Sequence, residues 1–327
     1  MHNFAFPEEQ RGRLLITRPL LAVGALLLAA LSSGSAGAYR GGDLVHDTLP
    51  AEVFGRSRGV LPAFEKSSEY PYDSSPGYSH KLQGVAHDSS HWYMTNRAKL
   101  WKIPVKRDLG VPEAWSKSAR IPSQLRGYDH LGDLDYHDGR LYVPLEGAAP
   151  AIGVFDSDLN YITHALLPNA FDAPWCAINP VDGHLYTSSF RTGVVRKYRM
   201  SWTGNSLALT EVASIALRDS AGKPLTLQRV QGGVFSARGH LYLVSDVSGQ
   251  GIKGFALETG RQRVDIPVHF ERDEELEGID LWDLDDGQVP GIDGQIHLQM
   301  IDHDWWSDDD FFFKHYRVTE PALKPNL

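Results

Sequence analysis

Two short segments of the chain place carboxylates close to a glycine. One is His130-Leu-Gly-Asp-Leu-Asp135 and the other is Glu277-Gly-Ile-Asp280. In each segment a carboxylate lies at or beside the glycine that begins an expected strand, and strand alternation places Asp133 and Asp135 on one face. Carboxylates that meet around a narrow channel repel one another, so we expect them to be protonated or to be neutralised by a bound cation.

This repulsion leads us to predict a divalent metal site. Its expected ligands are Asp133, Glu146, Asp246 and Glu277. Ca²⁺ fits this set best because it prefers oxygen ligands. Zn²⁺ and Mn²⁺ are the alternatives, because histidines lie nearby. The alternative is that Asp133 and Glu277 accept hydrogen bonds from backbone amides, or pair with arginines of other repeats.

Imidazole and aromatic side chains supply the other candidates. His130 and His303 are the candidate general acid or base, because imidazole titrates near neutral pH without help from its surroundings. The segment 302–310 holds acids and two indoles, and it forms either a lip that contacts the ligand or a solvated loop that covers the last repeat. The side chains that we expect to contact a ligand are Arg126, Trp175, Arg191, Trp305 and Trp306.

These residues are positioned by an internal repeat. Three segments align without gaps, and they are 132–143, 176–187 and 232–243. Each one predicts a strand, a tight turn that contains glycine, and a second strand that begins with Leu-Tyr. Further copies begin at residues 84 and 278. The spacing between copies is typical of β-propeller blades.

Further strand-like segments follow each hairpin, so each repeat predicts a blade of four antiparallel strands. We therefore expect an all-β chain that forms a five-bladed β-propeller, with six blades as the alternative. The expected organisation is a signal peptide at 1–38, an N-terminal clasp and loop segment at 39–78, and the propeller at 79–327. The segment 41–78 supplies either a clasp strand for the last blade or an irregular extra blade.

Propeller geometry gathers the candidate residues at one end of the ring. The loop that enters the first strand of a blade and the loop that joins its second and third strands lie at the same end, because the first two strands are antiparallel. These loops carry most of the charged and aromatic candidates, whereas the opposite hairpins carry turn residues. We therefore predict a ligand site at this end, at the mouth of the channel.

Composition and targeting signals restrict the classes of function. The formal net charge is −9, which disfavours a nucleic-acid partner. Residues 1–38 combine arginines, an apolar run and an Ala-Gly-Ala cleavage site, and the run is too short to span a bilayer. We expect a secreted or periplasmic monomer with no membrane span in the mature chain. The single cysteine, Cys176, cannot form an intramolecular disulfide, and we expect it to be buried and inert.

The first-strand segments Gln83-Gly84-Val85, Leu131-Gly132-Asp133 and Glu277-Gly278-Ile279 give the chain a family resemblance. It resembles exported propellers of the gluconolactonase-like, strictosidine-synthase-like and glutamine-cyclotransferase-like groups. For lactonase members, the resemblance implies a central divalent metal, held by carboxylate and amide ligands, that polarises a lactone carbonyl. It maps one such ligand onto Glu277.

Two hypotheses about function follow. The first is a metal-assisted hydrolase of the lactonase or esterase kind, or less favourably a lyase, that acts on a small molecule or glycan. The second is a non-catalytic propeller that binds glycans or another protein through Trp175, Trp305 and Trp306 and needs no metal. The fold alone does not choose between them, because propellers serve both purposes.

Overall fold

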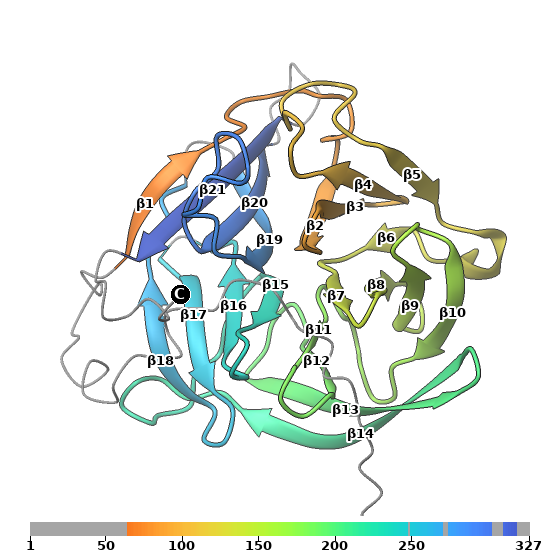
Figure 1. Cartoon of the computed structure of the whole chain (residues 1–327). Helices are drawn as coiled ribbons and strands as arrows, with labels where there is room; N and C mark the ends of the chain where they lie inside the picture. Colours follow the sequence, from red (N-terminus) through yellow and green to blue (C-terminus); the bar gives the residue numbers. More distant parts are fainter. Residues whose placement is uncertain (1–63, 248, 271–273, 303–309, 319–327) are drawn as a thin grey trace, which may run out of the picture. The chain divides into compact units, whose positions relative to one another are not determined.

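The computed structural model describes residues 64–247, 249–270, 274–302 and 310–318, and in this part of the chain the fold is a five-bladed β-propeller. Each blade is built from four antiparallel strand positions, and the blades follow one another in chain order around a ring (Figure 1). The predicted five-bladed, all-β architecture is confirmed. No helix in the described part of the chain has the length and apolar character to cross a bilayer.

We number the blades along the chain, starting from β2, and the innermost strand of each blade comes first. Blade 1 contains β2 (Leu82–His87), β3 (His91–Asn96), β4 (Lys99–Pro104) and β5 (Lys117–Arg120), and is followed by a 3-10 turn, η3 (Ser123–Leu125). In blade 2, β6 (His130–Leu131) and β7 (Asp135–His137) both pair with β8 (Arg140–Glu146), and β9 (Ala151–Asp156) and β10 (Tyr161–Leu166) complete the sheet.

Blades 3 to 5 repeat this order. Blade 3 contains β11 (Ala177–Ile178), β12 (Leu185–Thr187), β13 (Val194–Thr203) and β14 (Ser206–Ala216). Blade 4 contains β15 (Val230–Phe235), β16 (Leu241–Ser245), β17 (Gly251–Ala256) and β18 (Arg261–Ile266). Blade 5 contains β19 (Glu274–Leu281), β20 (Ile296–Asp302) and β21 (Phe311–Val318), and its outer strand is β1 (Phe64–Glu69).

The aligned hairpins fold as the sequence predicts. Gly139, Gly183 and Gly239 have φ values of 76°, 66° and 85°, which glycine adopts without strain. The Leu-Tyr pairs that follow them are buried, because these strands lie inside the sheets and face neighbouring blades on both sides. The glycine turn and the buried strand together explain why this segment recurs in the sequence.

The ring is closed by the earliest described strand. β1 pairs antiparallel with β21, so part of the segment 41–78 forms the outer strand of the last blade. Buried charges reinforce this closure, because Lys314 Nζ lies 2.6 Å from Glu274 Oε2 and 3.7 Å from Glu69 Oε1. The domain boundaries at 38 and 78 stay predictions, and the signal segment lies outside the described residues.

Apolar side chains fill the space between neighbouring blades. Five core clusters occupy the five successive interfaces, and one of them joins blade 5 to blade 1. That cluster packs Trp92 and Trp101 of blade 1 against Phe311 and Phe313 of blade 5. Because every blade is packed on both sides, the molecule needs no disulfide. Cys176 is fully buried, and burial raises the pKa of its thiol, as expected of an inert cysteine.

One buried carboxylate connects the blades at the centre of the ring. Asp133 is fully buried, and its Oδ1 accepts a hydrogen bond from the Val85 N–H of blade 1 at 3.0 Å. Its Oδ2 accepts hydrogen bonds from the Gly233 N–H of blade 4 at 3.1 Å and from the Ile279 N–H of blade 5 at 3.4 Å. Blade 3 is reached through the backbone, because the Cys176 N–H donates to the Asp133 carbonyl at 3.0 Å.

The glycines of the repeat make this close approach possible. A Cβ atom on Gly84 would lie 2.4 Å from Asp133 Cα, and one on Gly232 would lie 2.7 Å from Asp133 Oδ2. On Gly278 the distance to Asp133 Oδ1 would be 2.9 Å. Glycine is therefore required at these positions because a side chain would collide with Asp133 of another blade. It is not required by the backbone conformation, because the φ angles of these residues are not in the left-handed region.

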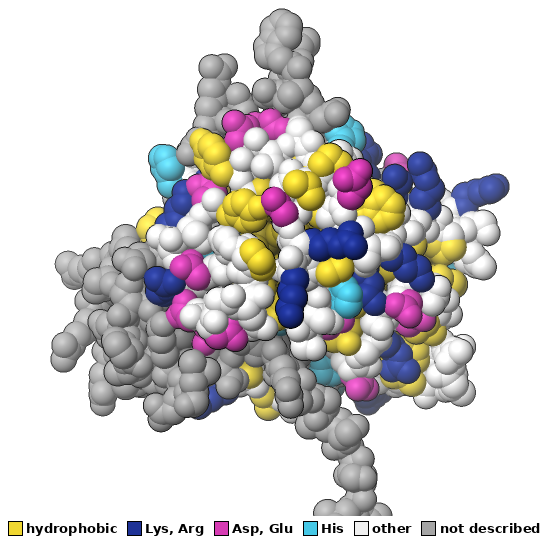
Figure 2. Space-filling model, turned by 45° about the horizontal axis from the view of Figure 1, so that its top comes forward, with side chains coloured by type: hydrophobic (Ala, Val, Ile, Leu, Met, Phe, Trp, Pro, Cys, Tyr) yellow, Lys and Arg dark blue, Asp and Glu magenta, His cyan; other side chains and the backbone are white. Residues whose placement is uncertain are grey.

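The visible face of the molecule carries charges of both signs. In Figure 2, Lys and Arg side chains are interspersed with Asp, Glu and hydrophobic side chains.

We predict that Asp133→Ala strongly destabilises the propeller. The change leaves three buried backbone N–H groups without acceptors, so we expect the free energy of unfolding to fall by about 3 kcal/mol or more. Urea unfolding measures the difference. The control is Asp158→Ala, which removes an exposed carboxylate bonded to Lys102 and should leave the midpoint nearly unchanged. Equal midpoints for the two variants would contradict the role of Asp133.

Candidate functional site

A cavity opens at the end of the ring that the sequence indicates. Its volume is about 390 Å³, and we call it the mouth cavity. The lining side chains come from all five blades. Blade 3 contributes only through its β12–β13 loop. They are Lys81, Gln83, Arg97, His130, Glu146, Phe190, Gln231, Glu275 and Glu277.

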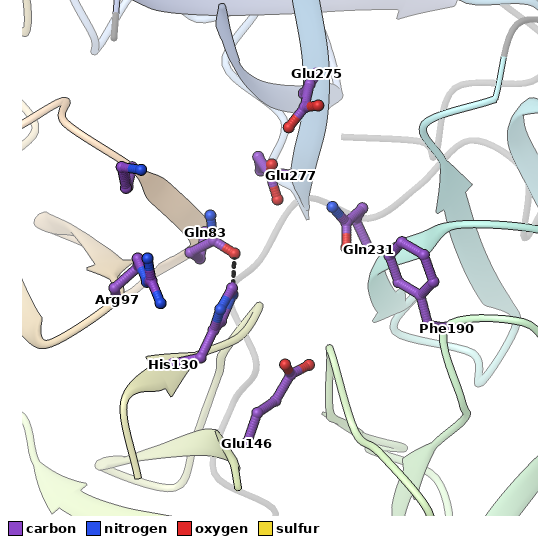
Figure 3. Close-up of a pocket in the computed structure, with 9 residues that line it drawn as sticks. Gln83, Arg97, His130, Glu146, Phe190, Gln231, Glu275 and Glu277 are labelled. Carbon is purple, nitrogen blue, oxygen red and sulfur yellow. Dashed lines mark hydrogen bonds between the residues drawn. The ribbon is translucent and has the colours of Figure 1, made fainter. Parts of the chain in front are cut away.

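Three β-bulges aim side chains into this cavity. The register of the first strand shifts between Leu82 and Gly84, between Val230 and Gly232, and between Leu276 and Gly278. The extra residues at these shifts are Gln83, Gln231 and Glu277, and all of them line the cavity (Figure 3). A bulge leaves its extra residue outside the ladder, so its side chain is free to point away from the sheet and toward a ligand.

The other lining residues are cross-strand neighbours at the rim of the blades. In blade 2, His130 pairs with Glu146. In blade 1, Lys81 and Arg97 each lie one residue beyond the Leu82–Asn96 pair, so they correspond to His130 and Glu146 of blade 2. In blade 5, Glu275 occupies this rim position on the first strand. The structure thus builds the mouth cavity from two positions of the blade repeat, the bulge and the rim pair, with Phe190 added from a loop.

Charge is unevenly distributed around the mouth cavity. Arg97 lies on the blade 1 side, and Glu275 and Glu277 lie on the blade 5 side (Figure 3). Lys81, which also lines the cavity, directly precedes β2 of blade 1. Glu146 points into the cavity from blade 2, across from the two blade 5 glutamates. A ligand in this cavity therefore meets cationic groups on one side and carboxyl groups on two others.

Two carboxyl groups of the cavity, those of Glu146 and Glu277, have a pKa above that of an ordinary glutamate. Burial, with smaller contributions from the charges of Asp172 and Asp129, raises the pKa of Glu146 to about 7. Burial also raises the pKa of Glu277, and the nearby carboxylates Glu275 and Asp246 act in the same direction. Glu146 thus changes its charge near neutral pH, and the pKa of Glu277 is shifted in the same direction.

The imidazole of His130 is neutral near pH 7. Burial, and then the charge of Arg97, lowers its pKa. Its Nε2 atom is hydrogen-bonded to Oε1 of Gln83 (Figure 3). Because Gln83 Oε1 can only accept, Nε2 carries the proton and Nδ1 is the basic nitrogen.

Three of the sequence-predicted site residues come together here. His130, Glu146 and Glu277 all line the mouth cavity. Asp246 lies at the rim of blade 4, where it forms an ion pair with Arg229, and its Oδ1 accepts a hydrogen bond from the Leu276 N–H at 3.1 Å. Burial raises the pKa of Asp246 to about 6. Asp133 accepts backbone hydrogen bonds at the ring centre, which favours the predicted alternative of amide capping over a metal-ligand role.

The remaining predicted residues lie elsewhere. Arg126 and Arg191 are exposed, and neither lines the mouth cavity. Trp175 is fully buried, and its Nε1 donates to Ser188 Oγ at 2.9 Å. The expectation that Trp175 contacts a ligand is therefore corrected, because its ring packs against the backbone of Gly233 and has no accessible face. His303, Trp305 and Trp306 lie outside the described residues.

Six lining residues were not selected by the sequence reasoning, and they are Lys81, Gln83, Arg97, Phe190, Gln231 and Glu275. A signal for the bulge residues was present, because Gln-Gly occurs at 83–84 and at 231–232, and Glu-Gly at 277–278. These dipeptides occupy the same position in three repeats. A polar residue before the repeat glycine marks the bulge, but only the register of the folded strands shows that it points inward.

Acidic side chains alone do not form a compact metal site in the mouth cavity. In the described part of the chain, the acidic or histidine trio whose ligand atoms lie within 4.8 Å of one another is Asp73, Asp302 and Asp310, which is a different place. Glu146 and Glu277 nevertheless face a cavity that also presents the amide side chains of Gln83 and Gln231. All of these groups offer oxygen ligands, which suits a hard cation such as Ca²⁺.

Comparisons with known proteins yield only distant structural similarity. No family model matches the chain, and no curated protein matches it. A structure described as a "putative gluconolactonase" matches with a TM-score of 0.46 and 12% identity, over 73% of this chain and 76% of the other. A luciferin-regenerating enzyme matches with a TM-score of 0.42 and 12% identity, over 73% and 77% of the two chains.

A third match is a protein of unknown function from Bacteroides caccae. Its TM-score is 0.40 at 13% identity, over 73% of this chain and 87% of the other. Similarity at this level says nothing about what the chain binds or does. The function has to be argued from the cavity itself.

We predict that Glu146→Gln stabilises the protein at alkaline pH. The folded-state pKa of about 7 lies above the ordinary value of 4.5, so the folded chain binds more protons than the unfolded chain between these values. The wild-type protein therefore loses stability as the pH rises through this window, whereas the amide variant does not. We expect a gain of about 1 to 2 kcal/mol at pH 8 and almost none at pH 4.

Thermal melts at the two pH values measure this difference. Glu113→Gln is the matched control, because Glu113 is exposed and lies away from the mouth cavity. A Glu146→Gln variant whose melting temperature follows that of the wild type at both pH values would show that Glu146 titrates as an ordinary glutamate.

Proposed function

We propose that the protein is a hydrolase that acts on a small molecule or glycan in the mouth cavity. The observation that carries this proposal is the pair Glu146 and Glu277, two carboxyl groups with raised pKa that face the same open cavity from different blades. Such groups are suited to proton transfer, because Glu146 changes its charge near neutral pH and burial favours the protonated form of Glu277. The pattern of residues 1–38 supports export, so we place this activity in the periplasm or outside the cell, in a monomer.

The geometry supports a distinct role for each carboxyl group in ester or lactone hydrolysis. Glu146, as the carboxylate, accepts a proton from the attacking water while the water oxygen bonds to the carbonyl carbon. Glu277, as the acid, donates a proton to the departing alkoxide oxygen when its bond to that carbon breaks. Proton exchange with solvent then restores both groups. Nδ1 of the neutral His130 provides a second proton acceptor beside the water.

We also propose that a divalent cation, preferably Ca²⁺ with Zn²⁺ or Mn²⁺ as alternatives, binds in the mouth cavity. In that state Glu146 and Glu277 would be ionised and would hold the cation together with the amide oxygens of Gln83 and Gln231, in place of the acid and base roles described above. When bound, such a cation polarises a substrate carbonyl. The cavity supports this because its carboxyl groups resist ionisation without a neutralising charge, as the raised pKa of Glu277 indicates.

Hydrolysis is tested with a panel of chromogenic esters and of lactones. We predict that the purified full chain cleaves at least one of them, with a rate that rises through about pH 7 as Glu146 loses its proton. Glu146→Gln should lower kcat about 100-fold or more, as expected for loss of a general base. The control Glu113→Gln should retain wild-type kcat. A panel without turnover, or full activity in Glu146→Gln, would exclude this function.

Metal binding is tested separately from activity. We predict that the protein titrated with Ca²⁺ melts at a higher temperature than the protein in chelator, because a ligand that binds only the folded state stabilises it. Glu277→Gln should abolish most of this increase. Identical melting curves with Ca²⁺, Zn²⁺, Mn²⁺ and chelator would contradict the metal proposal and leave the acid and base roles intact.

A further inference from the structure

One side-chain hydrogen bond joins two residues that line the mouth cavity from different blades. His130 of blade 2 donates from Nε2 to Oε1 of Gln83 in blade 1 (Figure 3). Gln83 is the extra residue of a β-bulge, and the other two bulges direct Gln231 and Glu277 into the same cavity. Gln83 is therefore the bulge residue that contacts a candidate catalytic side chain, and the question is what this contact does.

The orientation of the Gln83 amide is fixed by its own strand. Gln83 Nε2 donates a hydrogen bond to the Leu82 carbonyl at 3.1 Å, which leaves Oε1 as the atom that meets His130. Rotation of the amide by half a turn would present its NH2 group to His130 and would break the bond to Leu82. The structure therefore favours one orientation, in which the imidazole has to supply the proton of the bond between the two side chains.

A buried glutamine of blade 5 holds the backbone that carries Gln83. Gln299 lies on β20 and has no exposed surface. In the amide orientation that satisfies both of its ends, its oxygen accepts hydrogen bonds from the Gln83 and Gly84 N–H groups, both at 3.2 Å. Its nitrogen then donates to the Gly84 carbonyl at 2.8 Å. Gln299 thus supplies hydrogen bonds at the point where the bulge disrupts the ladder of blade 1.

The contact with Gln83 matters because His130 is neutral near pH 7. Burial and the charge of Arg97 lower its pKa, and the charge of Asp129 opposes this only in part. A neutral imidazole has one N–H group and one basic nitrogen. The nitrogen that donates to Gln83 cannot accept a proton, so the Gln83 amide determines which atom of the ring is the base.

We propose that Gln83 and Gln299 are positioning residues for the hydrolysis, and that together they hold His130 in the tautomer whose basic atom is Nδ1. Gln299 fixes the bulge, the bulge presents Gln83, and the Gln83 amide fixes the imidazole. Residues of blades 5 and 1 thus determine the protonation state of a side chain in blade 2. The part of this pair in catalysis rests on the proposed hydrolase function, whereas the tautomer of His130 does not.

Nitrogen-15 NMR of the histidine rings in the full chain tests the tautomer without any substrate. At pH 8 we expect His130 to carry its proton on Nε2, with its signals assigned from their absence in His130→Gln. Gln83→Met keeps the length of the side chain but removes the acceptor, so both tautomers should appear. The matched control is Gln231→Met, because it makes the same change at the corresponding bulge of blade 4 and should preserve the wild-type tautomer.

The same spectra decide against the proposal if it is wrong. A wild-type His130 protonated on Nδ1, or one tautomer retained in Gln83→Met, would overturn the role of Gln83. Gln299→Met should also give both tautomers, because the bulge loses its support. Wild-type spectra for His130 in that variant would remove Gln299 from the pair. A lower melting temperature with an unchanged tautomer would show that Gln299 has a structural role only.

A charged variant connects the tautomer to the reaction. Gln83→Glu places a carboxylate against Nε2, which favours the imidazolium and should raise the NMR midpoint of His130 by about 2 pH units. Because the imidazolium cannot accept a proton, we expect kcat for an ester to fall about tenfold at pH 7 and to recover at higher pH. Gln231→Glu adds the same charge to the cavity, so the difference between the two variants reports on His130.

The outcomes separate this inference from the hydrolase function. The expected tautomer in a protein that hydrolyses no ester would contradict the hydrolase function alone. Hydrolysis with the same pH profile in Gln83→Glu and Gln231→Glu, although the NMR midpoint of His130 rises in the first, would contradict the positioning role alone. Gln124→Glu is the control for both measurements, because Gln124 is exposed and does not line the mouth cavity.

Discussion

The ring depends on a carboxylate that is removed from water and held by backbone amides of three other blades. Asp133 has no exposure, and it is bonded to Val85, Gly233 and Ile279. Burial raises its pKa, while these N–H groups oppose the rise. A five-bladed ring brings its inner strands so close together that the repeat position beside the axis must be glycine in blades 1, 4 and 5. The short side chain of Asp133 then accepts hydrogen bonds from the amides of several strands at once.

Because Asp133 occupies the axis of the ring, the candidate site lies at the mouth. There the blades are alike in backbone and different in charge, because the same rim pair is Lys81 with Arg97 in blade 1, and His130 with Glu146 in blade 2. Bulges add a polar side chain from each of three blades. A repeated scaffold therefore produces an asymmetric cavity, with cations on one side and carboxyl groups on the others.

Much of this organisation could be predicted from the sequence, because it depends on local patterns. The glycine turns and Leu-Tyr strands identified three blades, and the further copies that begin at residues 84 and 278 gave five. Antiparallel pairing within a blade placed His130, Glu146 and Glu277 at one end. The rest depends on contacts between distant residues. The amides that bind Asp133 include those of Gly233 and Ile279, 100 and 146 residues further along the chain. No local pattern distinguishes that carboxylate from a metal ligand, or shows that Trp175 packs on a neighbouring blade.

The central claim about the site is that its environment prepares Glu146 for proton transfer near neutral pH. The most direct measurement is a ¹³C NMR titration of the glutamate side-chain carboxyl carbons, with the Glu146 signal assigned from its absence in Glu146→Gln. The structure predicts a midpoint near pH 7 for this signal. A midpoint near 4.5, the value of an ordinary glutamate, would contradict the account of the mouth cavity as a catalytic site.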